Sequence, residues 1–319
     1  MPYYAQLSQD YRIKSYDYIE NFIAEIDWSQ WGIGYNTDTA ETEFSRRIHA
    51  MSSLEFQFLL LHCGYIPDYY GKDSSQETLY SKLVESMVCE WAKRIGFNQS
   101  FLQKQKSNKE DITIMKDGNV IVCDAKSFRL GRSQAAPNVK DTIKKQAYAT
   151  WLNAYPHDKQ IGGLTTFPSM HDWKKGGEAY YYYTEGNPSI MLLFYEHMAF
   201  FLNQSIEADS IISFLGNYNA VYPVASKEKG VYWKGVYENL LNENWNDYWT
   251  ECTTYTQEKA KHTIDTLQNK INTIKQDVDG IIATKSHEEL IELAKQSIIE
   301  HRASDLLEQI HHIRNFRGV

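Results

Sequence analysis

The chain has only four cysteines, and they lie far apart in the sequence: Cys63, Cys89, Cys123 and Cys252. None of them forms a CxxC pair, whereas a structural zinc site needs closely spaced ligands. Isolated cysteines without secretory context are typical of reduced thiols in the cytoplasm. We therefore expect a cytoplasmic protein with neither disulfides nor structural zinc.

Long apolar runs are also missing. No stretch reaches the roughly 18 consecutive apolar residues that suggest a membrane span. The opening segment, MPYYAQLSQDYRIK, lacks the basic-then-apolar order of a signal peptide. We find no internal repeat and no low-complexity tail. With 319 residues, 42% of them hydrophobic, the chain is long enough for one large domain or two small ones with a substantial core.

Positive charge is in deficit overall but concentrated in one region. The formal net charge is −8 at pH 7, which by itself disfavours a nucleic-acid partner, because phosphate binding depends on lysine and arginine. Between Phe101 and Gln146, however, ten basic residues accompany only five acidic ones. A solvated surface can have the same composition, but the distribution of charge matters more than its sum. This region is therefore a candidate for contact with a polyanion.

The periodicity of the first half predicts helices followed by a strand pair. Residues 53–61 predict a buried helix that ends near Gly64. Ser75 is suited to be the N-cap of a second helix that runs to about Ile95. Residues 111–115 and 120–124 alternate as strands around the turn at 116–119, which predicts a β-hairpin.

The second half contains weaker signals and then long helices. A polar loop runs from Lys126 to Asn138. The further elements that we expect are a helix at 140–152, a core strand at 190–194, a helix at 196–202, and two long helices between 255 and 314, the second from 286 to 312.

The tripeptide Asp124-Ala125-Lys126 closes the second strand of this hairpin, and Asp111 stands 13 residues before it. Hydrolysis of a phosphodiester requires a positioned water, neutralisation of the phosphate and stabilisation of the leaving alkoxide. Mg²⁺ supplies the last two and prefers hard oxygen ligands. Asp111, Asp124 and the backbone carbonyl of Ala125 are ligands of this type. Lys126 lies on the same strand face as Asp124, where it could orient the water or stabilise the phosphate.

A further acid from the preceding helix, Glu85 or Glu77, could complete the metal shell. The alternative is that Asp-x-Lys is an ordinary surface ion pair, as it is in many proteins. The position at a strand end, the upstream acid and the basic surroundings favour catalysis. One departure is Glu110, since many nucleases of this type have proline before the first acid.

Glu196-His197 invites an interpretation as a general acid-base pair. A histidine whose hydrogen bonds are satisfied at a helix start is the simpler interpretation, and we favour it.

The segment from Asp124 to Arg132, DAKSFRLGR, resembles the active-site segment of the HindIII-type restriction endonucleases. Residues 75–82 resemble the first core helix of that family, and residues 193–199 resemble a later strand-to-helix segment. The three matches occur in the same order and cover roughly residues 60–205.

The resemblance implies an α/β fold, with a PD-(D/E)XK restriction-endonuclease-like core. Its central mixed β-sheet would be flanked by helices and followed by a helical C-terminal region. We divide the chain into a nuclease core with an N-terminal helical elaboration, 1–250, and a C-terminal helical region packed on or extending from the core, 251–319.

The same resemblance implies roles for individual residues. Asp111, Asp124 and Lys126 correspond to the metal-and-water residues, and Asp141 to a further acid near the active site. An acid about seven residues before the first catalytic aspartate is replaced here by Lys104. The loop from Ser127 to Asp141 corresponds to the segment that reads the DNA sequence, where Asn can pair with adenine and Arg with guanine. Its candidate DNA contacts are Ser127, Arg129, Arg132, Asn138 and Lys140.

The implied function is that of a type II restriction endonuclease, a homodimer that uses Mg²⁺ to cut both strands of a short palindromic site. AAGCTT is the first guess for that site, and a DNA methyltransferase is the expected genetic partner. Two alternatives remain open. One is another nuclease on the same core, such as a repair or junction-resolving enzyme, which would cut by structure. The other is a DNA-binding protein without catalysis.

Overall fold

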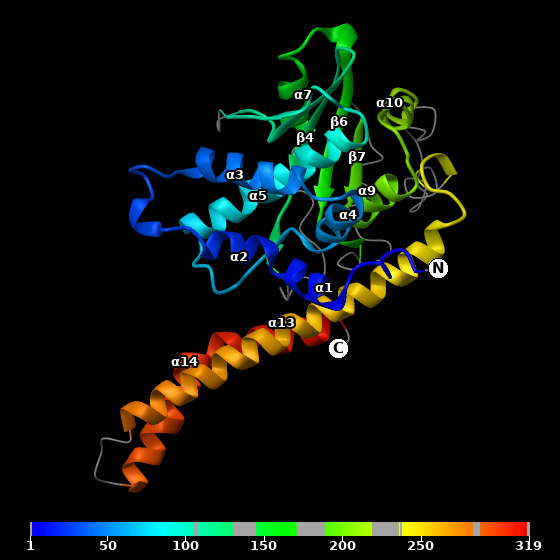
Figure 1. Ribbon diagram of the computed structural model, residues 1–319. Coiled ribbons are helices and arrows are strands. Elements are labelled where there is room, and N and C mark those ends of the chain that lie inside the picture. The colour runs from blue at the N-terminus through cyan, green and yellow to red at the C-terminus, as the bar shows by residue number, and fades with distance from the viewer. Residues whose placement is uncertain are drawn as a thin grey trace.

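A central β-sheet with helices on both sides forms the body of the protein, and two long C-terminal helices extend away from it (Figure 1). This arrangement confirms the predicted α/β class with a mixed sheet and a helical C-terminal region. The computed structural model describes residues 2–104, 108–129, 145–170, 189–218, 236, 238–282 and 288–317.

The described part of the sheet has five strands in the order β2-β3-β4-β6-β7. The first two neighbouring pairs are antiparallel and the last two are parallel. The strands are β2 (Phe101–Leu102), β3 (Ile112–Lys116), β4 (Asn119–Ala125), β6 (Gln160–Phe167) and β7 (Ile190–Phe194). The predicted hairpin is β3–β4. Its turn places Asp117 and Gly118 at φ of 52° and 80°, the left-handed conformations that a tight two-residue hairpin turn needs.

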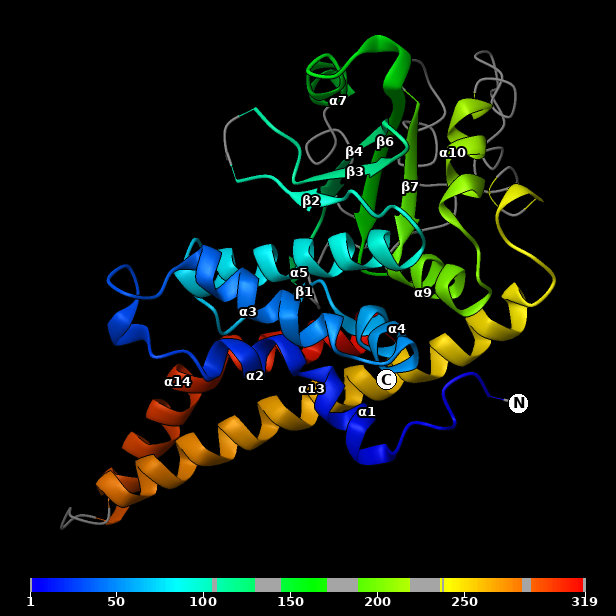
Figure 2. The same ribbon diagram turned by 45° about the horizontal axis from the view of Figure 1, so that its top comes forward.

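One face of the sheet is covered by α5 (Ser75–Arg94), with α3 (Thr37–His49) and α4 (Ser53–His62) beyond it (Figure 2). α5 begins one residue earlier than predicted. Ser74 is its N-cap, because the Ser74 hydroxyl accepts a hydrogen bond from the backbone N–H of Glu77 at 3.2 Å.

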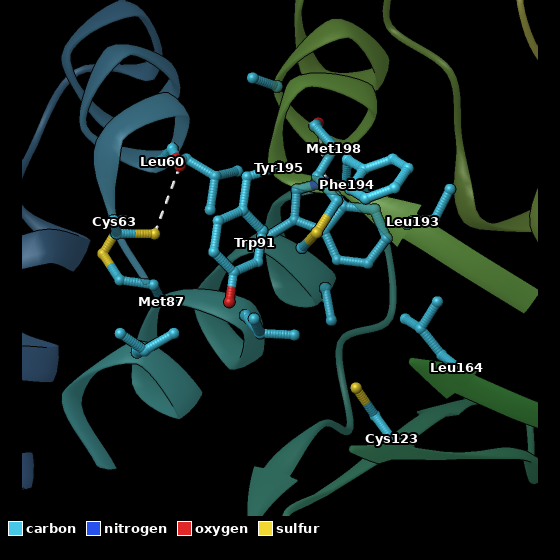
Figure 3. Packing of buried hydrophobic residues seen from close by; sticks show 14 of the residues in the cluster. Leu60, Cys63, Met87, Trp91, Cys123, Leu164, Leu193, Phe194, Tyr195 and Met198 are labelled. Carbon is cyan, nitrogen blue, oxygen red and sulfur yellow. Dashed lines mark hydrogen bonds between the residues drawn. The ribbon is translucent and has the colours of Figure 1, made fainter. Parts of the chain in front are cut away.

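The apolar core lies between α4, α5 and α9 (Tyr195–Asn203). Figure 3 shows Trp91 of α5 packed with Tyr195 and Met198 of α9. The Trp91 indole N–H donates to the backbone carbonyl of Met198 at 2.9 Å, so its one polar group is satisfied inside the core.

The opposite face of the sheet is covered by α7 (Lys145–Leu152), the described part of the predicted helix. Its Tyr148 is fully buried directly over Gly163 of β6. The Tyr148 hydroxyl is hydrogen-bonded to the Thr165 hydroxyl of the same strand. α10 (Ala208–Gly216) packs beside β6.

Short elements complete the body. They are α1 (Gln9–Tyr16), α2 (Tyr18–Ala24), the 3₁₀ turns at Trp28–Gln30 and His157–Lys159, and the two-residue strands β1 (Tyr65–Ile66) and β5 (Phe128–Arg129). β1 and β5 pair in parallel and were not predicted. β5 follows the Asp124-Ala125-Lys126 segment directly.

The C-terminal helices are α13 (Trp245–Ile282) and α14 (Glu288–Arg317). The sequence predicted the first of them only from residue 255. It begins earlier because Trp245, Tyr248 and Cys252 recur at helical spacing and are buried in the main core. Farther along, α13 and α14 share a second apolar cluster with Tyr65. No helix in the described ranges is long and apolar enough to cross a membrane.

Candidate active site

The β3–β4 hairpin brings Asp111 and Asp124 to the same place. Asp111 immediately precedes β3, and its backbone N–H donates to the carbonyl of Cys123 at 3.0 Å. Its carboxylate oxygen Oδ2 accepts from the backbone N–H of Ala125 at 3.1 Å. Asp111 is therefore held against the strand end that carries Asp124.

Lys126 lies beside Asp124, the second of these acids. Its Nζ lies 2.6 Å from Oδ2 of Asp124, and both side chains are largely buried, with 24% and 11% of their surface exposed. The backbone N–H of Lys126 donates to the carbonyl of Thr166 at 3.0 Å, which anchors it to β6. The structure thus brings together three of the four residues that were predicted as catalytic, and the fourth, Asp141, lies outside the described residues.

The electrostatics of the site are dominated by the crowding of its acids. Burial raises the pKa of Asp124 to about 7; the Lys126 ammonium group opposes this shift, and the neighbouring Asp111 adds to it. The buried carboxylate of Asp124 and the partly buried carboxylate of Asp111 share a single lysine, which leaves an excess of negative charge when both are ionised. A bound cation would relieve that excess.

Glu85 of α5 also belongs to this neighbourhood. Burial, and next the charge of Asp111, raise the pKa of the Glu85 carboxyl to about 8, whereas Lys82 lowers it. Lys82 Nζ lies 2.6 Å from Oε1 and 2.5 Å from Oε2 of Glu85. Lys82 was not among the site residues predicted from the sequence. Its spacing three residues before Glu85 on a helix was the signal that could have revealed the pair.

Glu77 lies elsewhere on α5, in a second ionic group. Its Oε2 accepts from the backbone N–H of Asp73 at 2.6 Å, and its Oε1 accepts from Arg129 at 2.8 Å. Arg129 also donates to the carbonyl of Pro67 at 3.0 Å and pairs with Asp68 at 3.3 Å. Only 14% of the Arg129 side chain is exposed, so its guanidinium group is turned into the protein.

The beginning of the predicted DNA-reading loop is fixed by β5. The backbone N–H of Phe128 donates to the carbonyl of Gly64 at 2.9 Å, and the Phe128 ring stacks on Phe167 at 5.6 Å. The Ser127 hydroxyl is buried and has no hydrogen-bond partner among the described residues. The other predicted DNA contacts, Arg132, Asn138 and Lys140, lie outside the described residues, and so does Asp141, the predicted further acid of the active site.

The two aspartates and the carbonyl of Ala125 form an all-oxygen donor set that suits Mg²⁺. Within the described ranges, no group of three or more His, Cys, Asp or Glu side chains has the geometry to hold a metal ion. Mg²⁺ keeps several waters and is commonly bound through one or two carboxylates, so the pair meets its needs. The charge and chemistry of the site therefore fit this ion.

The side chains of Glu110 and His197 are buried and form hydrogen bonds with neighbouring parts of the fold. Glu110 is buried and accepts from the Thr113 hydroxyl at 2.8 Å and from the Tyr155 hydroxyl, whereas the carboxylate of Asp111 bonds to β4. His197 accepts from the backbone N–H of Phe194 at 3.3 Å, which satisfies the N-terminus of α9. Burial lowers the pKa of His197 to about 3. His197 is therefore a buried residue at a helix start, where the favoured interpretation expected it. Lys104 lies exposed after β2.

Comparison with known proteins extends these observations over nearly the whole chain. The family model described as HindIII restriction endonuclease matches residues 20–310. The type II restriction enzyme HindIII of Haemophilus influenzae is 24% identical to this chain over 269 residues, which are 83% of this chain and 82% of that protein. The range matched by the family model contains Asp111, Asp124 and Lys126.

Proposed function

The chain belongs to the HindIII restriction endonuclease family, and from this premise we propose that it hydrolyses both strands of a short palindromic DNA site with Mg²⁺. It is a type II restriction endonuclease, and AAGCTT is the first site to test. The observation that supports catalysis is the contact of Lys126 with Asp124 beside Asp111, at the C-terminal end of the central strand β4. We assign these residues to a PD-(D/E)XK core.

In the proposed mechanism, Asp111, Asp124 and the carbonyl of Ala125 hold the metal. When bound, Mg²⁺ neutralises charge on the phosphate and stabilises the leaving oxygen. Lys126, whose Nζ lies 2.6 Å from Oδ2 of Asp124, positions the attacking water and stabilises the negative charge that develops on the phosphate. Glu85 is the acid of α5 that we propose for the metal shell, although in this structure Lys82 holds its carboxylate and the described acids include no group of three with the geometry of a metal site. The other acid considered, Glu77, is engaged by Arg129.

Sequence recognition is assigned to the segment from Ser127 to Asp141, which includes β5. Ser127, Arg132, Asn138 and Lys140 are its proposed DNA contacts, and Asp141 is a proposed further acid of the site. Base edges in the major groove distinguish all four base pairs, and each good side-chain pairing contributes about 1–3 kcal/mol of discrimination. Because this segment begins directly after Lys126, we propose that recognition and cleavage are linked through β5.

A palindromic target has two equivalent scissile bonds, and a two-fold dimer presents one active site to each. We therefore propose a homodimer. The enzyme would act in the cytoplasm together with a DNA methyltransferase that modifies the same site and thereby protects the host DNA.

The test is a digest of a sequenced plasmid with Mg²⁺ and with EDTA, followed by mapping of the ends. We expect discrete fragments with Mg²⁺ and none with EDTA. Asp124→Asn should lower cleavage at least about 100-fold while DNA binding remains. Asp117→Asn is the matched control, because Asp117 is exposed on the same hairpin and asparagine tolerates its positive φ.

Other results would favour the alternatives. Cleavage confined to branched or damaged DNA would indicate a repair or junction-resolving enzyme. A wild-type protein that binds DNA but does not cut it, and behaves like Asp124→Asn, would indicate a binding protein. Undiminished cleavage in EDTA would exclude the metal mechanism.

A further inference from the structure

Lys126, the proposed catalytic lysine, lies in a short stretch that belongs to no strand. Lys126 and Ser127 connect β4 to β5, so they lie outside the regular pairing of the sheet. The backbone N–H of Lys126 donates to the carbonyl of Thr166 in β6 at 3.0 Å. The Ser127 hydroxyl has no hydrogen-bond partner among the described residues. The orientation of Lys126 therefore depends on individual contacts from neighbouring elements.

One of these contacts comes from Tyr195, the first residue of α9. Ala125, Thr166 and Leu193 are paired neighbours near the ends of β4, β6 and β7. Because these three strands are parallel, their C-terminal ends meet at the same end of the sheet, and α9 begins there. The Tyr195 hydroxyl donates to the backbone carbonyl of Lys126 at 3.4 Å. The backbone of Lys126 is thus held on both sides of its Cα.

The Tyr195 side chain is itself fixed in place. It is fully buried in the core between α4, α5 and α9 (Figure 3). A Cβ at Gly64 would lie only 2.7 Å from Cε2 of Tyr195, so the ring packs directly against the Gly64 backbone. The Gly64 carbonyl in turn accepts from the backbone N–H of Phe128 at 2.9 Å. Burial raises the pKa of the Tyr195 hydroxyl well above its ordinary value, so the group stays protonated and can donate.

We propose that Tyr195 is a positioning residue for Lys126: its hydroxyl fixes the peptide that follows the lysine and thereby aims the ammonium group at the reacting phosphate. This inference rests on the proposed function, since it concerns the lysine of that same site. A catalytic group displaced by about 1 Å can slow a reaction about 100-fold. At 3.4 Å the hydrogen bond is long, so we expect a smaller effect from its loss.

A purely structural tyrosine would behave differently. The loss of any buried hydroxyl that is hydrogen-bonded lowers the stability of the fold. Only a positioning residue for Lys126 also slows the chemical step while the binding of DNA and Mg²⁺ stays unchanged. The binding of Mg²⁺ stays unchanged because its proposed ligands are Asp111, Asp124 and the carbonyl of Ala125, which keep their own contacts.

The experiment compares plasmid cleavage by the wild type and by Tyr195→Phe. Three quantities are measured: the maximal single-turnover rate, the affinity for DNA, and the Mg²⁺ concentration that gives half the maximal rate. Phenylalanine keeps the ring that packs against Gly64, so the variant retains the core. We expect the rate to fall about tenfold while the other two quantities stay within about twofold. Lys126→Met is the reference, because it removes the positioned group itself and should slow cleavage further.

Tyr4→Phe is the matched control. Tyr4 is also fully buried, and its hydroxyl is hydrogen-bonded to the hydroxyl of Tyr248 in α13 at 2.7 Å. Both phenylalanine variants should have a Tm lower by roughly 2–4 °C, because each loses one buried hydrogen bond. Tyr4→Phe should nevertheless cleave at the rate of the wild type.

The outcomes separate the positioning role from the proposed function. A Tyr195→Phe variant that has a lower Tm but cleaves as fast as Tyr4→Phe would overturn the positioning role. A Mg²⁺ requirement raised severalfold would overturn it as well, because the hydroxyl would then act on the metal ligands. A wild type that cuts no DNA with Mg²⁺ would overturn the proposed function, and the positioning role with it.

Discussion

At the residue scale, the raised pKa of Asp124 makes the stability of the fold depend on pH. Its folded-state pKa of about 7 lies above the ordinary 3.8 because of burial and the neighbouring Asp111, against the pull of Lys126. Between these two pH values the folded protein binds a proton that the unfolded chain has lost. The free energy of unfolding therefore declines as the pH rises from about 4 to about 7.

Asp124→Asn should remove this pH dependence, because an amide does not ionise. In EDTA at pH 8 we expect the variant to be more stable than the wild type by roughly 1–3 kcal/mol, and at pH 4.5 the difference should be much smaller. Chemical denaturation at the two pH values measures it. Asp117→Asn, exposed on the same hairpin, should show no such change, and an equal gain at both pH values would refute the explanation.

Arg129 offers a second prediction at this scale. Its contacts with Glu77, Asp68 and the carbonyl of Pro67 anchor β5 to the start of α5. Arg129→Met removes the cation that pairs with the largely buried carboxylates of Asp68 and Glu77. We therefore expect the free energy of unfolding to fall by about 2–4 kcal/mol. The salt dependence of DNA binding should stay as in the wild type. A salt slope reduced by about 1 would instead identify Arg129 as a phosphate contact.

The proximity of Asp111, Asp124 and Lys126 could be predicted from the sequence because it arises within one short hairpin. Asp124 and Lys126 share a strand face, and a short hairpin returns to Asp111. Two other features could not be predicted, because each depends on contacts between separate elements. Arg129 is typical of a DNA contact in a basic loop, but Pro67, Asp68 and Glu77 are more than 50 residues away in sequence. The Lys82–Glu85 spacing is visible in the sequence, but the burial of the pair by other elements is not.

At the element scale, segments with a clear local pattern appeared near their predicted bounds, and segments that depend on distant contacts did not. α5, the β3–β4 hairpin and β7 appeared within a few residues of the prediction. β6 was missed because its Gly162-Gly163 pair has low strand propensity. It forms because Tyr148 of α7 covers Gly163 and β4 pairs along it. The two-residue strands β1 and β5 depend entirely on each other, so no local pattern predicts them.

Gly163 tests this account of β6. A Cβ at this position would lie 2.3 Å from Cδ1 of Tyr148, in a fully buried contact between α7 and the sheet. Gly163→Ala should therefore destabilise the protein by about 1–3 kcal/mol, measured by urea denaturation.

Gly280→Ala is the matched control. Gly280 is exposed within α13 and has no heavy atom within 4 Å of the added Cβ, so the change should stabilise the helix by up to about 1 kcal/mol. A Gly163→Ala variant as stable as Gly280→Ala would show that α7 is not packed on β6 as described.

At the scale of the whole molecule, α13 is both part of the body and the base of the projecting helical pair (Figure 1). The helix runs without interruption through the predicted boundary at residue 250. Just beyond it, the Glu251 carboxylate accepts from the backbone N–H groups of Tyr3 and Tyr4, at 2.6 and 3.0 Å. Tyr255 packs edge-on against Phe58 at 5.1 Å. Lys259 lies within 3.9 Å of Glu20.

These contacts predict that two truncations differ sharply. A chain that ends at Thr250 loses Glu251, Tyr255 and Lys259, so it exposes part of the main core and leaves Glu20 without its cation. We expect it to be unfolded or aggregated. A chain that ends at Ile282 keeps all three residues and loses only the cover that α14 gives to α13. It should fold with a Tm lower by roughly 5–10 °C.

Circular dichroism melts and limited proteolysis of the two truncated chains provide the measurement. Lys259→Met in the full-length chain is the point-mutation counterpart and should cost about 3–5 kcal/mol if α13 is docked through this buried charge. A stable, cooperatively melting protein of residues 1–250 would show that the body folds without α13. The C-terminal region would then be an independent appendage, and its contacts with the N-terminal segment would contribute little to the stability of the nuclease core.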